Sequence, residues 1–220
     1  MTELVALRPQ RKIGTSRRAL TGRLALGDSK AVEFESSLER DWLELLDFEP
    51  RVEALQVQPF SLFHQVDGAQ RRYTPDVMAI WGREGPSETV VYEVKYRDDL
   101  RKNWRDLRPR FVAATRYCRE RGWRFKIVTD KHIRTPRLRS VKFLRPYRRL
   151  DPNPAIQGDL LDRLTLLGST SVRGLLEATY STHEARVEAL PFFWRLVANF
   201  QIEMDLDAPL RMSSVVRSSA

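Results

Sequence analysis

Two acidic motifs in this chain hold residue types that could work together on one reaction. They are Tyr73-Thr-Pro-Asp76 and Glu93-Val-Lys95, and both lie in short runs rich in Val, Ile and Tyr that are typical of strands. Side chains two apart on a strand share a face, so Glu93 and Lys95 point the same way. If the two strands are neighbours, Asp76, Glu93 and Lys95 converge on one spot.

Two carboxylates at one spot can bind a hard cation such as Mg²⁺ or Mn²⁺, and the carbonyl of Val94 is placed to be a further ligand. A bound metal ion together with the Lys95 ammonium suits hydrolysis of a phosphodiester, which needs an activated water and positive charge near the phosphate. The alternative is that these are ordinary surface residues, because each motif by itself is common. Their combination in one sheet favours the site.

A further acid comes from an expected amphipathic helix over residues 34–48. Its apolar residues recur at helical spacing, and Glu39 lies at the edge of this buried stripe. Glu35 lies one turn earlier on a similar face. The spacing by itself therefore leaves both acids as candidates.

The elements that would position these residues are a helix, three strands, a helix and a strand. The strands are expected at residues 57–63, 73–80 and 89–96, and they are antiparallel because the loops between them are short. A long helix over residues 101–121 follows, which Pro109 should kink or split, and then a strand over 123–128. This order predicts an α/β domain whose mixed sheet carries helices on its faces.

The rest of the chain divides into further segments. A basic arm is expected at residues 1–30, a catalytic domain at 31–146, a linker at 147–154 and a C-terminal domain at 155–220. Three helices (155–167, 171–180 and 185–200) and a hairpin (202–216) favour a winged-helix module, although any small helical adaptor would show the same pattern.

The charge of the chain indicates a polyanionic partner. There are 38 Lys and Arg residues against 29 Asp and Glu, which gives a net charge of +9 and a pI near 10.0. Nucleic acid is the first candidate and a membrane surface the second. The basic arm could lie on DNA phosphates or be a solvated tail; its candidate DNA-binding residues are Arg11, Lys12, Arg17, Arg18 and Arg23.

Several classes of protein are disfavoured. We see no apolar stretch long enough to span a bilayer and no signal peptide, so we expect a cytoplasmic protein without a membrane partner. The single cysteine, Cys118, cannot form an internal disulfide, and its place in the long helix suits a small buried side chain. The three histidines are far apart in sequence, which makes structural zinc improbable.

An ordered series of motifs resembles the TnsA-type endonuclease subunit of heteromeric transposons. The series is Phe34-Glu-Ser-Ser-Leu-Glu-Arg-Asp, then Val57-Gln-Pro, then Tyr73-Thr-Pro-Asp, then Tyr92-Glu-Val-Lys, and it continues to Ile127-Val-Thr-Asp-Lys131. The likeness covers roughly residues 17 to 135. It implies a restriction-endonuclease-like core.

The resemblance also assigns roles to residues. The catalytic acid of the early helix corresponds to Glu39, which favours it over Glu35, and Glu39 is also a candidate metal ligand. Asp76 and Glu93 correspond to metal ligands and Lys95 to the catalytic lysine. Some family members carry Gln at the position of Glu93. Gln58 matches a family glutamine near the site, where it either hydrogen-bonds a ligand or acts directly.

The implied function is metal-dependent cleavage at the 5′ ends of a transposon, on the non-transferred strand, during cut-and-paste transposition. The implied partners are the transposon ends, a DDE transposase (TnsB-like) and an AAA+ ATPase regulator (TnsC-like), and residues 155–220 would contact partners and DNA. The alternatives are an autonomous restriction or repair nuclease of the same superfamily and a non-catalytic DNA-binding subunit. Three acids gathered around one lysine disfavour the non-catalytic DNA-binding subunit, because a scaffold has no need to bring acids together against their mutual repulsion.

Overall fold

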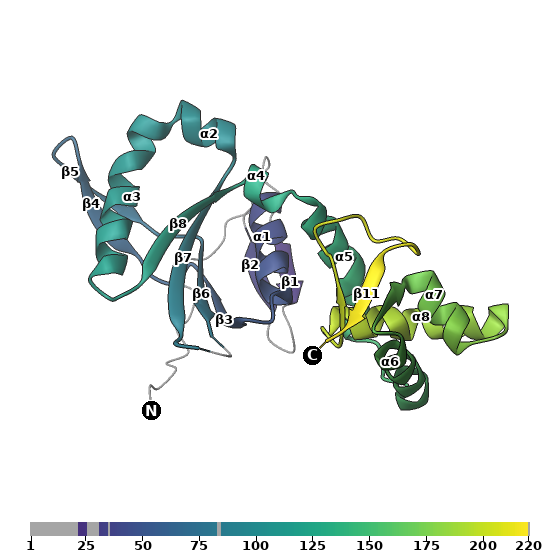
Figure 1. Ribbon diagram of the computed structural model, residues 1–220. Coiled ribbons are helices and arrows are strands. Elements are labelled where there is room, and N and C mark those ends of the chain that lie inside the picture. Colours follow the sequence, from purple (N-terminus) through teal and green to yellow (C-terminus); the bar gives the residue numbers. More distant parts are fainter. Residues whose placement is uncertain (1–21, 26–30, 35, 83–84, 220) are drawn as a thin grey trace. The chain divides into compact units, whose positions relative to one another are not determined.

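The computed structural model describes residues 22–25, 31–34, 36–82 and 85–219, and it divides the chain into two compact units. Unit 1 ends at Arg134 and unit 2 begins at Thr135 (Figure 1). The basic residues Arg11, Lys12, Arg17 and Arg18 and the alternative acid Glu35 lie outside the described residues. Arg23 belongs to strand β1 (Gly22–Ala25), which pairs with β2 (Ala31–Phe34), but its side chain is not described.

The centre of unit 1 is a four-stranded mixed sheet in the order β3-β6-β7-β8. The strands are β3 (Val52–Val57), β6 (Val77–Trp81), β7 (Glu88–Lys95) and β8 (Arg124–Thr129). β6 is antiparallel to β3 and to β7, whereas β8 runs parallel to β7. The parallel pair needs a long crossover, which the intervening helices supply. The predicted mixed α/β fold is confirmed.

Helices cover both faces of this sheet (Figure 1). On one face α1 (Ser37–Phe48) places Trp42 with its ring centroid 5.1 Å from that of Tyr92 in β7. On the other face α3 (Trp104–Arg119) places Phe111 6.0 Å from Phe125 in β8. Since side chains alternate along β7, Tyr92 faces α1 and its neighbour Glu93 faces α3.

Two of the predicted strands were wrong in their bounds, because prolines interrupt them. The expected strand over 57–63 is the end of β3 and the start of β4 (Leu62–Val66), separated at Gln58-Pro59. The expected strand over 73–80 is the end of β5 (Ala69–Tyr73) and most of β6, separated at Thr74-Pro75-Asp76. A proline has no N–H to donate to a strand partner, so strands end beside it.

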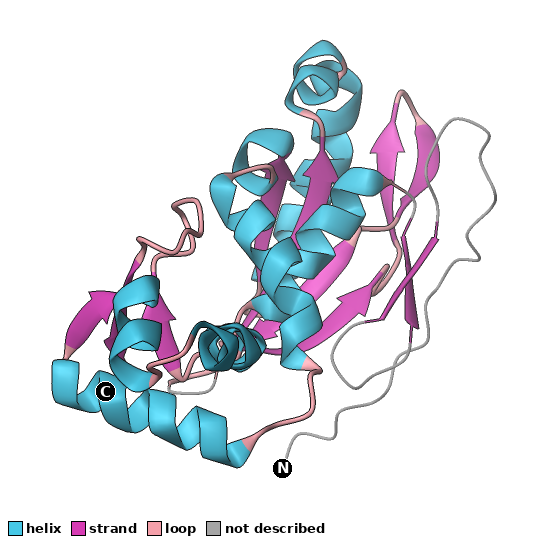
Figure 2. Cartoon of the chain, turned by 90° about the vertical axis from the view of Figure 1, so that its right-hand side faces the viewer, coloured by secondary structure: helices cyan, strands magenta, loops and turns pink. Residues whose placement is uncertain are grey.

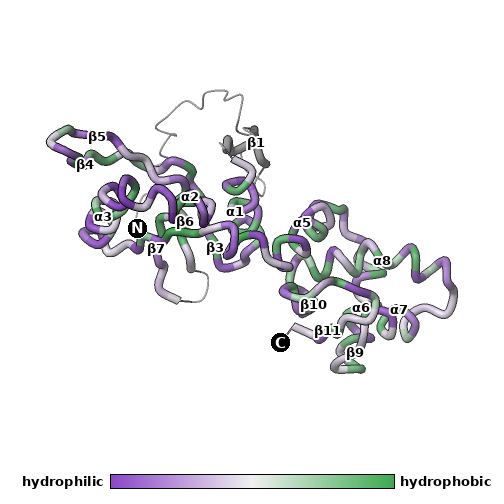
Figure 3. The backbone as a smooth tube through the Cα atoms, turned by 90° about the horizontal axis from the view of Figure 1, so that it is seen from above, coloured by the Kyte–Doolittle hydropathy of each residue, from purple (hydrophilic) through white to green (hydrophobic). Residues whose placement is uncertain are grey.

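β4 and β5 form a separate antiparallel hairpin whose turn is Asp67-Gly68. Both turn residues have positive φ, 50° and 79°, as a tight two-residue hairpin turn requires. The tube at β5 is mainly hydrophilic in Figure 3, and residues 69–72 are exposed. The base of the hairpin is buried instead: Leu62 and Tyr73 form a core cluster with Phe111 and Ala114 of α3.

Two helix predictions also need correction. The first helix begins at Ser37 rather than Phe34, which lies in β2; the side chain of Ser36 accepts a hydrogen bond from the Glu39 N–H and caps the helix. The long helix is divided at Asn103, between α2 (Arg97–Lys102) and α3, whereas Pro109 lies inside α3. A proline within a helix removes one backbone hydrogen bond, and here the helix continues through it.

Unit 2 consists of helices beside a small three-stranded sheet (Figure 2). Its helices are α5 (Pro136–Arg148), α6 (Pro154–Leu167), α7 (Val172–Thr179) and α8 (His183–Ala198). Its strands are β9 (Ser169–Ser171), β10 (Ile202–Met204) and β11 (Val215–Ser218), in the antiparallel order β10-β11-β9. The three predicted C-terminal helices thus have counterparts in α6, α7 and α8. The hairpin predicted at 202–216 corresponds to β10 and β11.

The predicted linker at 147–154 does not coincide with the boundary between the units. The structure divides the chain before α5, while residues 147–148 end α5 and Pro154 begins α6. The sequence carries a signal for α5, because Leu138, Val141 and Leu144 recur at a spacing of three and are buried. Among the described residues, no helix is both long and apolar enough to cross a membrane.

Candidate active site

Asp76 lies directly before β6, next to the last residues of β7. Its N–H donates to the carbonyl of Tyr92 at 3.2 Å, which extends the pairing of the two strands by one residue. Its carboxylate Oδ2 accepts the N–H of Val94 at 2.7 Å. Two hydrogen bonds therefore hold Asp76 against the Glu93-Val-Lys95 motif, as the sequence predicts.

The Lys95 ammonium lies among the acceptors of this motif. Its Nζ is 2.9 Å from Glu93 Oε1 and 3.6 Å from Asp76 Oδ2, and it donates to the Val94 carbonyl at 2.9 Å. Burial by itself lowers the pKa of Lys95, but the charges of Asp76 and Glu93 more than offset this and leave the pKa above its ordinary value. Lys95 is therefore protonated at neutral pH in the metal-free site, where its ammonium is a hydrogen-bond donor.

Asp76 is in an environment that disfavours its charge. Burial is the largest cause and the negative charge of Glu93 the next largest, and together they raise the pKa of Asp76 well above its ordinary value. Lys95 and the Val94 N–H act in the opposite direction without reversing the shift. Two acids crowded in this way are the arrangement that a cation would relieve.

Glu93 is held by two residues that the sequence analysis did not place in the site. Its side chain is only 2% exposed; Oε2 accepts the hydroxyl of Tyr73 at 2.5 Å, and Oε1 lies 3.5 Å from Nη2 of Arg110. Tyr73 opens the Tyr73-Thr-Pro-Asp76 motif, but nothing in its spacing shows where its hydroxyl points. Arg110 lies four residues before the buried Ala114, at the edge of the buried stripe of α3, and that position was its sequence signal.

Arg110 is packed between rings as well as paired. Its guanidinium carbon lies 5.4 Å from the centroid of the Tyr73 ring and 5.3 Å from that of Phe111. Its Nε is buried and has no hydrogen-bond partner within the described part of the chain. A planar, permanently charged side chain clamped in this way fixes one oxygen of Glu93, as Tyr73 fixes the other.

Glu39 stands apart from the acid pair. Its carboxylate Oε1 accepts the hydroxyl of Ser36 at 3.1 Å, and its charge is one of the smaller causes that raise the pKa of Asp76. Glu39 is therefore near enough to act on Asp76 electrostatically. No three His, Cys, Asp or Glu side chains among the described residues are grouped closely enough to hold a metal ion, so a ligand role for Glu39 stays a prediction.

Gln58 touches the site through its backbone. Its N–H donates to the carbonyl of Asp76 at 2.8 Å, and its φ of 46° is in the left-handed region. A residue other than glycine in that conformation is strained by about 1–2 kcal/mol, and such strain is often found near functional sites. The predicted role of the Gln58 side chain stays a prediction.

The donor set suits a hard divalent cation. Asp76 and Glu93 offer carboxylate oxygens and Val94 a carbonyl oxygen, and the Lys95 ammonium contacts all three residues. Mg²⁺ in proteins is held by one or two carboxylates and keeps several waters, so two carboxylates and a carbonyl are sufficient. The group fits the metal that the sequence motifs imply.

Comparison with protein families gives two matches in succession. The family described as TnsA-like endonuclease N terminal matches residues 49–130, and TnsA endonuclease C terminal matches residues 132–206. The chain belongs to the TnsA endonuclease family. A comparison with curated proteins gave no match.

Membership makes this TnsA-type protein a DNA endonuclease of transposition, with the restriction-endonuclease-like fold expected from the sequence. It also implies DNA and the proteins of a Tn7-type transposase as partners. The first match includes Asp76, Glu93 and Lys95, whereas Glu39 precedes it. The boundary between the two matches lies close to the boundary between units 1 and 2.

Proposed function

We propose that this protein cuts the 5′ ends of a transposon, on the non-transferred strand, by Mg²⁺-dependent hydrolysis of a phosphodiester bond. The observation that carries the proposal is the convergence of Asp76, Glu93 and Lys95 in a chain of the TnsA endonuclease family. A DDE transposase would cut and join the 3′ ends, and an AAA+ ATPase would regulate the complex. These partner roles follow from the family resemblance described above.

In this proposal Asp76, Glu93 and the Val94 carbonyl hold the cation. The bound ion would supply positive charge at the phosphate and acidify a water molecule. Glu93 presents its oxygens in a fixed orientation, because Tyr73 and Arg110 hold it from two sides. The N–H of Val94 does the same for Asp76.

Lys95 contributes as a protonated donor. Its ammonium faces the same space as the two carboxylates, so a phosphate oxygen entering that space would accept a hydrogen bond from it. It would offset negative charge that develops on the phosphate. Glu39, in the first turn of α1, is a further acid within electrostatic reach of Asp76, and we assign it a supporting role in binding the cation or orienting the water.

The test is a nicking assay on duplex DNA that carries the transposon end, with each strand labelled separately, in Mg²⁺, with and without the transposase. We expect wild-type protein to nick only the non-transferred strand and only with the transposase present, and Asp76→Ala to give no nick. Asp162→Ala is a matched control, because Asp162 is an exposed acid of α6 in unit 2.

Each other outcome has a definite meaning. Identical products from wild type and Asp76→Ala under every condition would refute the catalytic proposal. Nicking by the wild-type protein without the transposase would instead favour the autonomous nuclease. Cleavage of the transferred strand by an Asp76-dependent activity would refute the assigned strand.

A further inference from the structure

The segment that follows Lys95 carries a group of exposed basic side chains. Arg101 and Lys102 end α2, and Arg105 and Arg108 lie in the first turns of α3; all four side chains are exposed. None of the four forms an ion pair with another residue that the structure describes. We call these four residues the α2–α3 cations.

The helix geometry puts Arg105 and Arg108 on the solvent side of α3. At about 100° per residue, Arg105 and Arg108 stand about 60° apart. Arg105 projects directly away from the buried Ala114, and Arg108 projects about 120° from it. Asp106 projects to a different side of the helix, about 100° from Arg105. The acid therefore does not cancel the charge of this face.

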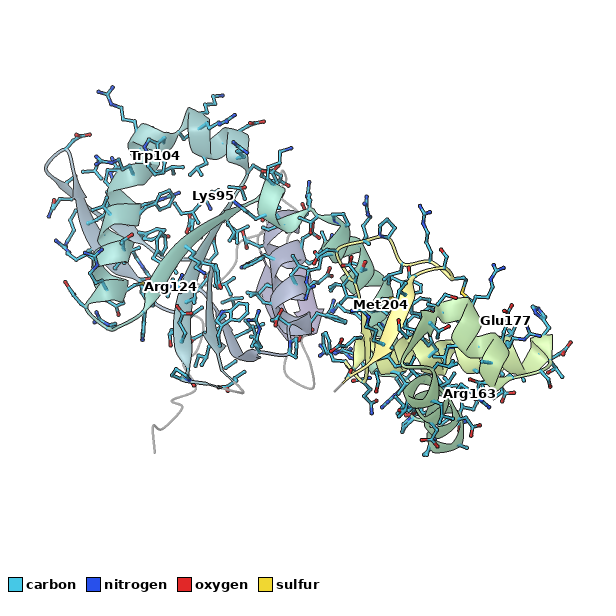
Figure 4. All side chains as sticks on the ribbon, viewed as in Figure 1. Lys95, Trp104, Arg124, Arg163, Glu177 and Met204 are labelled. Atoms are coloured by element: carbon cyan, nitrogen blue, oxygen red, sulfur yellow. The ribbon has the colours of Figure 1, made fainter. Side chains whose placement is uncertain are left out.

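This surface lies at the end of unit 1 that holds the active site. α2 begins two residues after Lys95, and its first N–H, that of Arg97, donates to Asp130 Oδ1 at 2.7 Å just beyond the end of β8. Figure 4 shows Lys95 and Trp104 toward one end of the unit and Arg124, at the start of β8, toward the other. Arg110, less than one turn beyond Arg108, reaches Glu93 itself.

We propose that the α2–α3 cations bind the sugar-phosphate backbone of the DNA beside the scissile bond. The inference rests on the proposed function, since it takes the acid pair as the place of cleavage. DNA that reaches Lys95 would pass this end of unit 1, and exposed basic side chains that form no ion pair within the described part of the chain are complementary to phosphates. These contacts are independent of base sequence, so they position the DNA and leave the choice of site to the partner proteins.

The same helix supplies a matched control. Arg116 and Arg119 are also exposed, are also three residues apart, and project to the same side of α3 as Arg105 and Arg108. They lie at the far end of the helix, about 17 Å along its axis at 1.5 Å per residue. The two pairs thus differ in their distance from Lys95 and not in charge, exposure or helix face.

The experiment measures binding of the full chain to a fluorescein-labelled duplex of the transposon end, in a chelating buffer that prevents cleavage, over a series of salt concentrations. We compare wild type with the double variants Arg105→Gln/Arg108→Gln and Arg116→Gln/Arg119→Gln. The slope of log K against log salt concentration is negative, and each lost phosphate contact reduces its magnitude by about 0.9, so the magnitude should be smaller by about 1.8 in the first variant. The second should keep the wild-type slope. Glutamine retains helix propensity, and circular dichroism checks the fold.

An unchanged slope in Arg105→Gln/Arg108→Gln, or wild-type protein that does not bind the duplex even at low salt, would overturn the inference. An equal loss in both double variants would also overturn it, because the effect would then be one of net charge. The salt-dependence experiment and the nicking assay test the two proposals separately. Loss of nicking in Asp76→Ala with an unchanged slope in the arginine variant rejects only the DNA surface, and the reverse pattern rejects only the catalytic proposal.

Discussion

Replacing Tyr73 by phenylalanine tests whether the buried hydroxyl organises the acid pair. Tyr73 is 5% exposed and its O–H donates to Glu93 Oε2 at 2.5 Å, while its ring lies 6.3 Å from that of Phe111. Burial, and then the charge of Glu93, raise the pKa of Tyr73 far above its ordinary value, so the hydroxyl remains a donor at any working pH. Tyr73→Phe keeps the ring packing and removes only this donor.

The size of the effect follows from the charge and burial of the acceptor. A hydrogen bond to a charged group contributes about 1.5–3 kcal/mol, and a distance of 2.5 Å is at the short end for a hydroxyl and a carboxylate. Lys95 and Arg110 still face the other oxygen of Glu93, which keeps the loss within that range rather than above it. With a urea m-value of about 2 kcal/mol per molar, the midpoint should fall by about 1 M.

Unfolding in urea with a chelator present measures this loss, and tryptophan fluorescence reports mainly on unit 1, which holds Trp42, Trp81, Trp104 and Trp123 but not Trp194. Tyr92→Phe is the control. Tyr92 is 3% exposed and faces the opposite side of β7, so its hydroxyl does not serve Glu93, and its removal should cost no more than about 0.5–1.5 kcal/mol.

Equal losses in the Tyr73 and Tyr92 variants would refute the reasoning. A second measurement bears on function rather than stability. Since Tyr73 orients a proposed metal ligand without contacting the substrate, Tyr73→Phe should raise the Mg²⁺ concentration needed for half-maximal nicking. Tyr92→Phe should leave it unchanged.

Three further predictions concern Asp76, Ser36 and Cys118. Because the pKa of Asp76 is raised in the folded protein, folding favours the neutral carboxyl. This contribution to the stability of the protein is complete below the ordinary carboxylate pKa and is lost as pH rises through the raised pKa of Asp76. Asp76→Asn should therefore increase the free energy of unfolding at neutral pH in chelator while abolishing nicking; a less stable variant would contradict this. Ser36→Ala removes the cap of α1 and should cost about 1 kcal/mol in urea unfolding, and no loss would show that the cap is not formed. Burial raises the pKa of Cys118 to about 11, so iodoacetamide at about pH 8 should label the native thiol far more slowly than the unfolded one, and equal rates would contradict its burial.

The sequence was sufficient for the mixed α/β fold of unit 1 and for the approximate places of α1, β7, α3 and β8, because the apolar periodicities there are strong. Prediction from the sequence failed where a single residue determines whether a strand ends or which backbone conformation is adopted. Pro59 and Pro75 each divide what looks like a single apolar strand, and the positive φ of Gln58 cannot be read from its residue type. Helix α5 was not predicted either. Its prolines and many arginines make its apolar periodicity weak, although Leu138, Val141 and Leu144 form a buried stripe.

The candidate site was predictable to the extent that it depends on strand geometry. Asp76, Glu93 and Lys95 meet because of alternation along β7 and the pairing of β6 with β7, and both follow from the sequence pattern. The contacts of Tyr73 and Arg110 with Glu93 could not be predicted, because a hydroxyl at the base of a hairpin and a guanidinium on a helix reach Glu93 only through tertiary packing, although the place of Arg110 beside the buried stripe was a partial signal. The position of Glu39 relative to the acid pair depends on how α1 packs on the sheet, which spacing does not specify.

The contacts of Lys95 connect the stability of this site with its chemistry. Asp76 and Glu93 repel each other in a partly buried space, and among the residues that the structure describes Lys95 forms ion pairs with both and partly offsets that repulsion. A cation bound by the same carboxylates would offset it instead and leave the ammonium free to face a phosphate. Lys95→Met should then lower the unfolding free energy in chelator by more than in Mg²⁺, because the ion would replace the lost positive charge. Equal losses in both buffers would mean that the acid pair does not bind Mg²⁺ in the protein without DNA.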